Sequence, residues 1–375
     1  MSRFSYLDYN ATAPVRPAVI DAMRDVLERV GNPSSVHRFG REARRALEHA
    51  RAQVAMMVGA APSQVVFTSG GTEANNQALC GVCGPVAVSA IEHESVLAAV
   101  SYARRILVDA AGRIDLAALE HELVGSAPAL VSVMLANNET GVIQPVRDVV
   151  ELARRHGARV HSDAVQAGGK LAIDLEALGV DFLTLSAHKF GGPQGVGALV
   201  VAKGLEPDPL LRGGGQERRW RPGTENLSGI VGFGRACELA MADAGCWERT
   251  AALRDGLEAR LTRLAPTAEV FGREVERLPN TSCITMPGVS NHTQLIEFDL
   301  AGIAVSTGSA CSSGKVGPSH VLAAMGVDSA VAASAIRISL GWASTADDVD
   351  HLVDAWGRLY ARTRLAATDA LVPPA

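Results

Sequence analysis

Lys189 and Asp163 are the two residues whose types and positions most directly suggest chemistry. Lys189 follows an apolar run in LSAHKFGGPQGVG, and Asp163 ends the preceding run in VHSDAVQ. A lysine amine at the edge of a site can form a Schiff base with an aldehyde, although most lysines are surface residues with a packed stem. Asp163 shifts this balance, because a carboxylate can keep the ring nitrogen of a pyridine cofactor protonated.

A glycine-rich turn supplies the third part of the pattern. SGGTEANNQAL places Gly70, Gly71 and Thr72 before a predicted helix, where free backbone N–H groups and the helix dipole favour an anion such as phosphate. Two glycines before a helix are common, and neither G-x-x-x-x-G-K-[ST] nor G-x-G-x-x-G is present. Together, however, the phosphate cup, the lysine and the pyridinium partner predict pyridoxal 5'-phosphate as the cofactor.

Cys311 stands in STGSACSSGKVGPSH, among serines and glycines with no apolar residue beside it except Ala310. This composition predicts a solvated loop, not a strand or a core helix. A cysteine in such a loop is either an incidental surface residue or a reactive thiol. The segment alone leaves both interpretations open.

The elements that must position these residues alternate between strand and helix patterns. Helices are expected at residues 16–30, 39–58 and 144–156. Short apolar runs bounded by turn residues predict buried strands of a wholly or mostly parallel sheet. These runs are QVVFTSG, PVAVSA, ALVSVMLA, ARVHSDA, DFLTLSA and GVGALVVA. The fold class is therefore α/β, and the polar residues after each strand should gather at the carboxyl edge of the sheet.

A second, smaller α/β domain is predicted after a helical stretch over residues 229–264. Its strands are expected in LPNTSCITMPG, IAVSTGS and AIRISLGW, with a helix at 346–366. At 375 residues the chain exceeds what a single core usually supports. We expect a large domain at 15–255, and a small domain formed by 1–14 with 256–375 that carries the Cys311 loop.

Composition excludes several classes of protein. The formal charge of -5 gives no basic surface for nucleic acid, and no apolar stretch is long enough for a membrane span. The N-terminus shows no secretory signal, so a soluble, cytoplasmic protein with no membrane or nucleic-acid partner is expected. The six cysteines are then free thiols, and the single C-x-x-C pair, Cys80 and Cys83, does not predict a metal site.

The ordered motifs resemble the cysteine desulfurases of the NifS/IscS type, within the class V, fold-type I pyridoxal phosphate enzymes. The resemblance runs almost end to end, and it is carried by LDYNATAPV, GNPSSVHRFG, FTSGGTEANN, EHESV, NNETGVIQP, SDAVQAGGK, SAHKFGGPQGVG, RPGTEN, STGSACSSG and IRISLG. It implies a homodimer whose large domains contain seven-stranded sheets, with active sites near the dimer interface.

The resemblance also implies a role for each matching residue. Lys189 would hold the cofactor as a Schiff base, Asp163 would pair with its pyridine nitrogen, and His93 would stack on its ring and assist proton transfer. The remaining matches would bind other parts of the cofactor and the substrate: Gly71, Thr72, Ser186 and His188 the phosphate, joined by Thr224 of the neighbouring subunit; Gln166 and Asn138 the phenolic oxygen; Asn138 the substrate as well; and Arg337 the substrate carboxylate.

In this family the Cys311 thiolate would attack the sulfur of substrate L-cysteine, so that L-alanine leaves and a persulfide stays on the enzyme. A Gly/Ser loop suits a thiol that must reach the substrate and then an acceptor. The long form of this loop resembles group I. A sulfur-acceptor protein, as in iron–sulfur cluster assembly, is the implied partner. The C-terminus RTRLAATDALVPPA lacks the longer tail that IscS-like members use toward their scaffold protein, which puts docking in the IscS manner in doubt.

Two other interpretations stay open. The same fold could support another pyridoxal phosphate reaction, such as selenocysteine lyase, kynureninase or aminotransferase chemistry. Transamination needs no loop thiol, so Cys311 argues against it. A non-enzymatic binding protein is disfavoured because Lys189, Asp163, His93 and Arg337 are all present as well.

Overall fold

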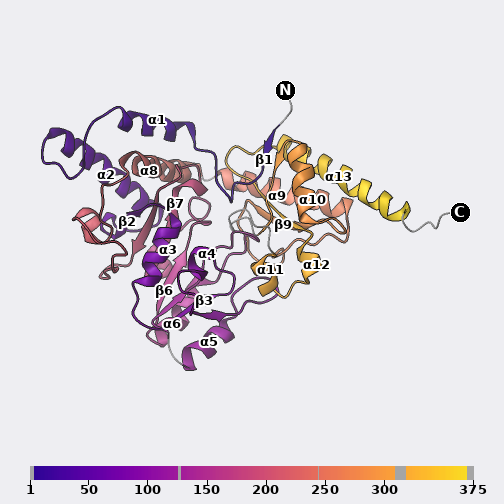
Figure 1. The fold of residues 1–375 in the computed structure, drawn as a ribbon, viewed down its shortest axis with the longest axis horizontal. Helices are drawn as coiled ribbons and strands as arrows, with labels where there is room; N and C mark the ends of the chain where they lie inside the picture. The colour runs from indigo at the N-terminus through magenta and orange to yellow at the C-terminus, as the bar shows by residue number, and fades with distance from the viewer. Residues whose placement is uncertain (1–3, 126–127, 244, 309–317, 370–375) are drawn as a thin grey trace.

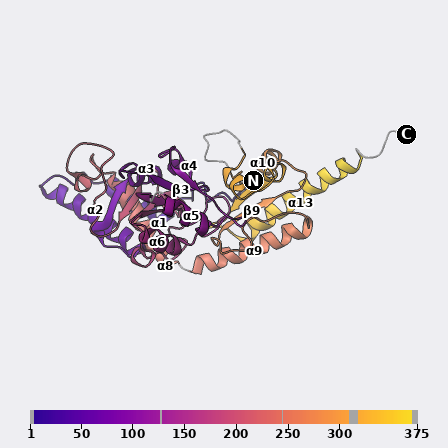
Figure 2. The ribbon, with the colours of Figure 1, turned by 90° about the horizontal axis from the view of Figure 1, so that it is seen from below.

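The computed structural model describes residues 4–125, 128–243, 245–308 and 318–369. Figure 1 shows two parts side by side, a larger one built on a central sheet and a smaller one that contains both chain ends. Figure 2 shows the elongated shape that results. Cys311 lies outside the described residues.

A seven-stranded sheet forms the centre of the larger part. Its order is β2-β8-β7-β6-β5-β3-β4, and every neighbouring pair is parallel except the two pairs that β8 makes. The strands are β2 (Val65–Thr68), β3 (Val86–Ser89), β4 (Arg104–Ile106), β5 (Leu130–Ser132), β6 (Arg159–Asp163), β7 (Phe182–Ser186) and β8 (Gly197–Val201). This arrangement confirms the predicted α/β class and the mostly parallel seven-stranded sheet.

Side chains of successive strand residues enter two different cores. In β8, Ala198 and Val200 join one hydrophobic cluster, whereas Leu199 and Val201 join the other. Both faces of the sheet are therefore covered, which explains why its strands appear in the sequence as continuous apolar runs. The first cluster contains residues of α2 (Arg38–Met57), α5 (Leu116–Gly125), α6 (Val146–Arg155) and α8 (Leu227–Ala242), and the second contains residues of α3 (Gly71–Cys80) and α4 (Glu94–Leu97).

Other short elements complete the larger part. Helix α1 (Pro17–Leu27) contacts α8, and Figure 1 shows it at the upper left, above α8. The remaining elements are α7 (Leu175–Leu178) and the 3-10 turns η1 (Pro62–Gln64), η2 (Ala187–Lys189) and η3 (Gln216–Arg219).

The smaller part has a core of its own. Its strands form two short pairs, β1 (Ser5–Tyr6) with β10 (Ile303–Ala304) and β9 (Thr281–Thr285) with β11 (Ala335–Ser339). Trp356, Phe298, Leu257 and Ile336 are buried together there. The helices of this part are α9 (Gly245–Leu264), α10 (Asn291–Leu300), α11 (His320–Ala324), α12 (Ser329–Ala332) and α13 (Ala346–Asp369). Figure 2 shows α9 and α13 running alongside each other.

Three elements differ from the expected pattern. The helical stretch expected over 229–264 is two helices, α8 and α9, separated near residue 244. Strand β4 has the sequence RRI and was not expected, because an edge strand needs no apolar run. The domain division at residue 255 stays a prediction, and α9 runs continuously across it.

Within the described ranges, no helix is long and apolar enough to cross a membrane.

Gly197 is a point of close approach between the sheet and the turn after β2. It pairs with both Thr68 and Ser186, and a Cβ built on it would lie 2.6 Å from the backbone carbon of Gly70 and 2.7 Å from the Leu185 carbonyl oxygen. The atoms that this Cβ would meet belong to the backbone, so no side chain can rotate away to relieve the overlap. We predict that Gly197→Ala lowers the free energy of unfolding by about 1–3 kcal/mol through overpacking, measured by urea denaturation.

Gly256→Ala is the matched control for this substitution. Gly256 lies in α9, and a Cβ there would meet no atom within 4 Å. The control should therefore raise stability slightly, by up to about 1 kcal/mol, because alanine favours the helix. Equal effects of the two substitutions would contradict the close approach at Gly197.

Candidate functional site

A cavity of about 280 Å³ opens at the carboxyl ends of the parallel strands, where an open α/β sheet binds its ligands. The cavity is lined by Gly71, Thr72, Asn75, His93, Ser95, Met134, Ala136, Asn138, Asp163, Val165, Gln166, Ser186, His188 and Lys189. Nine of the residues expected to act on cofactor or substrate are thus brought together, namely Gly71, Thr72, His93, Asn138, Asp163, Gln166, Ser186, His188 and Lys189.

Asp163 ends β6 as a buried carboxylate that is 5% exposed. Its Oδ1 accepts from the N–H of Val165 at 2.9 Å, and its Oδ2 accepts from Asn75 Nδ2 at 2.7 Å. Asn75 Nδ2 also donates to Ser95 Oγ at 2.8 Å, and Ser95 Oγ lies 2.7 Å from His93 Nδ1. A chain of polar contacts therefore connects Asp163 to His93 along the cavity wall.

His93 occupies the N-cap of α4, where its Nδ1 accepts from the Ser95 N–H at 3.1 Å. His93 therefore caps a helix, as a histidine with a purely structural role could, and it also lines the cavity. The two contacts to Ser95 fix the plane of the ring. A fixed ring is what a side chain needs if it is to stack on a cofactor.

Lys189 is the last residue of the turn η2, directly after β7. Its Nζ donates to the backbone carbonyl oxygens of Asn10 at 2.6 Å and Ala11 at 3.0 Å. Both acceptors belong to the N-terminal segment, which crosses from the smaller part of the molecule. The amine therefore lies where the two parts meet.

A polar hollow adjoins the cavity at the start of α3. It shares Gly71, Thr72, Ser186 and His188 with the cavity. A Cβ on Gly71 would lie 2.8 Å from Val165 Cγ2, so only glycine leaves this turn open. The first-turn N–H groups of a helix have no intrahelical acceptor and favour an anion.

His188 lies at this hollow as a neutral side chain. Burial, with Lys189 and Lys170 nearby, lowers the pKa of His188 to about 4. Its Nδ1 is 3.2 Å from Thr12 Oγ1. At neutral pH the ring therefore acts as a hydrogen-bonding group and adds no charge.

Three expected site residues are not among the described residues that line the cavity. Arg337 is buried in β11 at the edge of the site, where Nη2 donates to Asp8 Oδ1 at 2.7 Å and Nη1 to the Asn138 carbonyl oxygen at 3.1 Å. Thr224 is exposed, and it is not among the described residues that line the cavity. Cys311 falls outside the described part of the chain.

Sequence reasoning missed Asn10, Asn75, Lys170 and Glu139. All four are buried, and each contacts a cavity residue, the N-terminal segment or the flank of the Cys311 segment. Asn75, Lys170 and Glu139 stand within the quoted motifs TSGGTEANN, DAVQAGGK and NNETG, and Asn10 stands in LDYNATAPV. A motif position was therefore the only available signal, since burial of a polar residue cannot be read from its type.

Glu139 is the most unusual of these residues. Its buried carboxylate accepts from Ser319 Oγ at 2.5 Å, and a Cβ built on Gly308 would overlap Oε2. Burial raises the pKa of Glu139, while Ser319, His320, Arg337 and His93 oppose that rise. Gly308 and Ser319 flank residues 309–317, so one carboxyl group contacts both sides of the segment that contains Cys311.

The donor set of the cavity fits pyridoxal 5'-phosphate. A lysine amine, a buried carboxylate and a hollow formed by glycine, two hydroxyl residues and a helix N-terminus surround one space. These groups match an aldehyde, a pyridine nitrogen and a phosphate, respectively.

Comparisons with known proteins agree with the site. The model of the aminotransferase class-V family matches residues 5–352. A cysteine desulfurase of Cereibacter sphaeroides is 46% identical over 93% of this chain and 94% of its own length. The crystal structure of a NifS-like protein from Rickettsia africae superposes with a TM-score of 0.90 at 38% identity, over 96% of this chain and 100% of that one.

A third relative was solved with a ligand. The structure described as SspA in complex with cysteine is 32% identical, has a TM-score of 0.79 and covers 91% of this chain and 100% of that one. The fold and site define a class-V aminotransferase-type enzyme that uses pyridoxal 5'-phosphate. Within that class, the chain belongs to the cysteine desulfurase family.

Glu92, next to His93, generates a prediction about pH. The carboxyl group is fully buried, Oε1 accepts from the Met134 N–H at 2.5 Å, and Oε2 has no partner among the described residues. Burial, and then the nearby charge of Asp163, raises the pKa of Glu92 well above its ordinary value. The folded state therefore holds this proton to higher pH than the unfolded state does.

Between the unfolded and folded pKa values of Glu92, stability should fall by about 1.4 kcal/mol per pH unit as pH rises. Glu92→Gln keeps an acceptor for Met134 and removes this titration. We predict that the melting temperature of Glu92→Gln minus that of the wild type grows as pH rises from about 5 to 8. Exposed Glu94→Gln is the matched control, and a difference that stays constant with pH would contradict a protonated Glu92.

Proposed function

We propose that the protein is a cysteine desulfurase that removes sulfur from L-cysteine, releases L-alanine and retains a persulfide on Cys311. The observation that carries this proposal is the single cavity that holds Lys189, Asp163 and His93 beside a phosphate-type hollow. The cysteine desulfurase relative and the relative solved with cysteine support the choice of reaction and substrate.

Pyridoxal 5'-phosphate, when bound, would supply an electron sink for bonds at the substrate carbons. Lys189 would hold its aldehyde carbon, and Asp163, fixed by Asn75 and the Val165 N–H, would keep the pyridine nitrogen protonated. Gly71, Thr72, Ser186 and neutral His188 would bind the phosphate. Gln166 and Asn138 would lie near the phenolic oxygen.

The substrate-directed roles belong to Arg337, Asn138, His93 and Cys311. We infer that Arg337 binds the substrate carboxylate together with Asn138, whose carbonyl oxygen it already contacts. His93, with Nδ1 held by Ser95, would move a proton at the substrate.

Cys311 would act as the nucleophile toward the substrate sulfur. A sulfur–sulfur bond forms with its thiolate while the carbon–sulfur bond of the substrate breaks. The electron pair of that bond stays with the carbon, which takes up a proton and leaves as the methyl group of alanine. The sulfur is oxidised to the persulfide level and the carbon is reduced, so no external oxidant is needed.

The persulfide must be discharged before a second turnover. We infer a sulfur-acceptor protein as the partner, with an iron–sulfur cluster scaffold in the cytoplasm as the first one to test. The smaller part of the molecule, residues 1–14 with 256–375, is proposed as the domain that presents Cys311 to both substrate and acceptor.

The reaction can be tested directly with Cys311→Ala. We expect the wild type to release sulfide and alanine from L-cysteine in the presence of a thiol reductant. Cys311→Ala should keep the yellow cofactor colour and lose at least about a hundredfold in alanine formation, because the nucleophile is gone. Alanine and sulfide are quantified separately.

Cys83→Ala is the control for that test, since Cys83 is an exposed free cysteine between α3 and β3. It should turn over like the wild type. Undiminished turnover by Cys311→Ala, or a wild type that leaves cysteine unchanged, would contradict the proposal and direct screening toward selenocysteine lyase or aminotransferase substrates.

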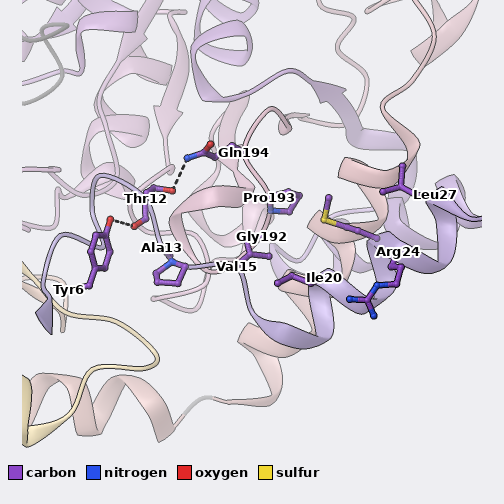
Figure 3. Close-up of a pocket in the computed structure, with 12 residues that line it drawn as sticks. Tyr6, Thr12, Ala13, Val15, Ile20, Arg24, Leu27, Gly192, Pro193 and Gln194 are labelled. Carbon is purple, nitrogen blue, oxygen red and sulfur yellow. Dashed lines mark hydrogen bonds between the residues drawn. The ribbon is translucent and has the colours of Figure 1, made fainter. Parts of the chain in front are cut away.

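We also propose that the protein is a homodimer in which Thr224 reaches the neighbouring site. Large apolar side chains are exposed around α1 and the start of α2, including Leu27, Val30, Val36 and Phe39. Beside them lies a largely apolar groove of about 750 Å³ that extends from Ile20 and Leu27 to Gln194 and Thr12 near the site (Figure 3). Exposed apolar surface of this kind marks an interaction site.

A subunit-mixing experiment tests the role of Thr224. Lys189→Ala and Thr224→Asp should each be nearly inactive alone, because one lacks the cofactor amine and the other repels the phosphate. Co-expressed, they should form mixed dimers with one intact site, restoring about a quarter of wild-type alanine formation per subunit if subunits pair at random. Mixtures that stay as inactive as the two variants alone would contradict a shared site.

A further inference from the structure

Lys170 is a buried lysine at the site that none of the roles above uses. Its side chain is 5% exposed, and in the described part of the chain no carboxylate oxygen lies within 4.0 Å of Nζ. Burial lowers the pKa of Lys170 well below its ordinary value, and the charges of Lys189 and Arg337 lower it further. A lysine in this position is costly for stability, so it calls for a functional explanation.

Both partners of Lys170 are amide oxygens. Nζ donates to Gln166 Oε1 at 2.9 Å and to Asn10 Oδ1 at 3.1 Å. A lysine has at least two N–H bonds whether it is charged or neutral, so both contacts form in either protonation state. If the Gln166 amide were reversed, Oε1 would face the Asn10 carbonyl oxygen, and the NH₂ group would face Lys170 Nζ, which has no lone pair to accept it while the lysine is charged.

Hydrogen bonds from Lys170 and to Asn10 therefore orient the Gln166 carboxamide. With Oε1 held by Lys170, Nε2 donates one hydrogen to the Asn10 carbonyl oxygen at 2.9 Å and retains a second hydrogen. Gln166 also lines the cavity. The same Asn10 carbonyl oxygen accepts from Lys189 Nζ, so Lys170, Gln166 and Lys189 all converge on Asn10.

The turn that carries both residues is well fixed. Gln166 and Lys170 lie four residues apart on the segment after β6, and Lys170 N–H donates to the Ala167 carbonyl oxygen at 2.9 Å. The Gly169 carbonyl oxygen accepts from Trp247 Nε1 at 2.6 Å, and a Cβ on Gly169 would lie 2.8 Å from the Phe190 ring. These contacts fix the backbone from which the Gln166 and Lys170 side chains extend.

We propose that Lys170 is a positioning residue that holds the Gln166 carboxamide so that the cavity presents an N–H donor to the phenolic oxygen of the cofactor. This inference rests on the proposed function, because Gln166 is assigned to that oxygen there. A donor at this oxygen favours its anionic form and so makes a proton shared with the neighbouring Schiff-base nitrogen easier to lose. Without Lys170 the carboxamide keeps only its bond to the Asn10 carbonyl oxygen, and its N–H group is no longer held toward the phenolic oxygen.

The test is the pH titration of the visible absorption band of the cofactor-loaded protein. We expect Lys170→Met to raise the pH midpoint of this band by about half a unit or more, because the phenolic oxygen loses its donor. Lys203→Met is the matched control, since Lys203 is exposed and undergoes the same chemical change. Its midpoint should equal that of the wild type, and an unchanged midpoint in Lys170→Met would overturn the proposal.

A double-mutant cycle separates positioning from a direct effect of the lysine charge. If Lys170 acts through Gln166, Lys170→Met should produce no additional shift in a Gln166→Ala background. A shift of the same size in both backgrounds would overturn the proposal, because the lysine would then act by its own field. A loss of thermal stability without a change in midpoint would show a merely structural role and would also overturn it.

Gln166→Glu keeps the proposal testable if Lys170→Met does not fold. The carboxylate retains a contact with Lys170 and presents only acceptor oxygens to the cavity, so the midpoint should rise at least as far. A constant midpoint would overturn the proposal. A wild type with the visible band but no alanine release contradicts only the proposed function, whereas an unchanged Lys170→Met in an alanine-releasing enzyme contradicts only this inference.

Discussion

The hydrogen bonds of the buried Asn10 amide hold the site together. Its Oδ1 accepts from Lys170 and Asn280, and its Nδ2 donates to Thr281 Oγ1 and the Asn138 carbonyl oxygen. The side chain thus connects the segment after β6, the turn after β5 and the start of β9. These belong to both parts of the molecule, so the cavity at their boundary depends on one fully paired amide.

Burying each polar group of the site costs stability, and the hydrogen bonds between these groups offset part of that cost. Asp163 is buried but accepts from a backbone N–H and from Asn75. Lys170, in contrast, has no carboxylate within reach in the described ranges, and Glu92 has an unpartnered oxygen there. Locally unfavourable features such as these buried groups tend to occur at functional sites, where a ligand or a reaction can use hydrogen-bonding groups that the fold leaves unpaired.

The sequence predicted the elements with strong patterns and missed those that depend on tertiary contacts. As expected, β6 ends at Asp163, and Lys189 follows shortly after β7, because buried parallel strands need continuous apolar residues. Strand β4 was missed because RRI at the sheet edge has no such run. In ALVSVMLA the strand covers only Leu130–Ser132, although the N–H groups of Val133 and Leu135 still donate to carbonyl oxygens of β6. Lys170 and Asn10 were missed as site residues because their burial, and the contact between them across 160 residues, cannot be read from residue type.

The turn at residues 137–141 shows how one short segment can serve two parts of a reaction. Asn137 Oδ1 accepts from the N–H groups of Glu139 and Thr140 and so fixes the turn. The Asn138 carbonyl oxygen then accepts from Arg337, the proposed substrate clamp, while the Glu139 carboxylate accepts from Ser319. Since Gly308 also lies against Glu139, the places where the chain enters and leaves the Cys311 segment share a rigid support with the carboxylate clamp. A substrate held by Arg337, as proposed, would therefore depend on the same turn as the residues that flank the Cys311 segment.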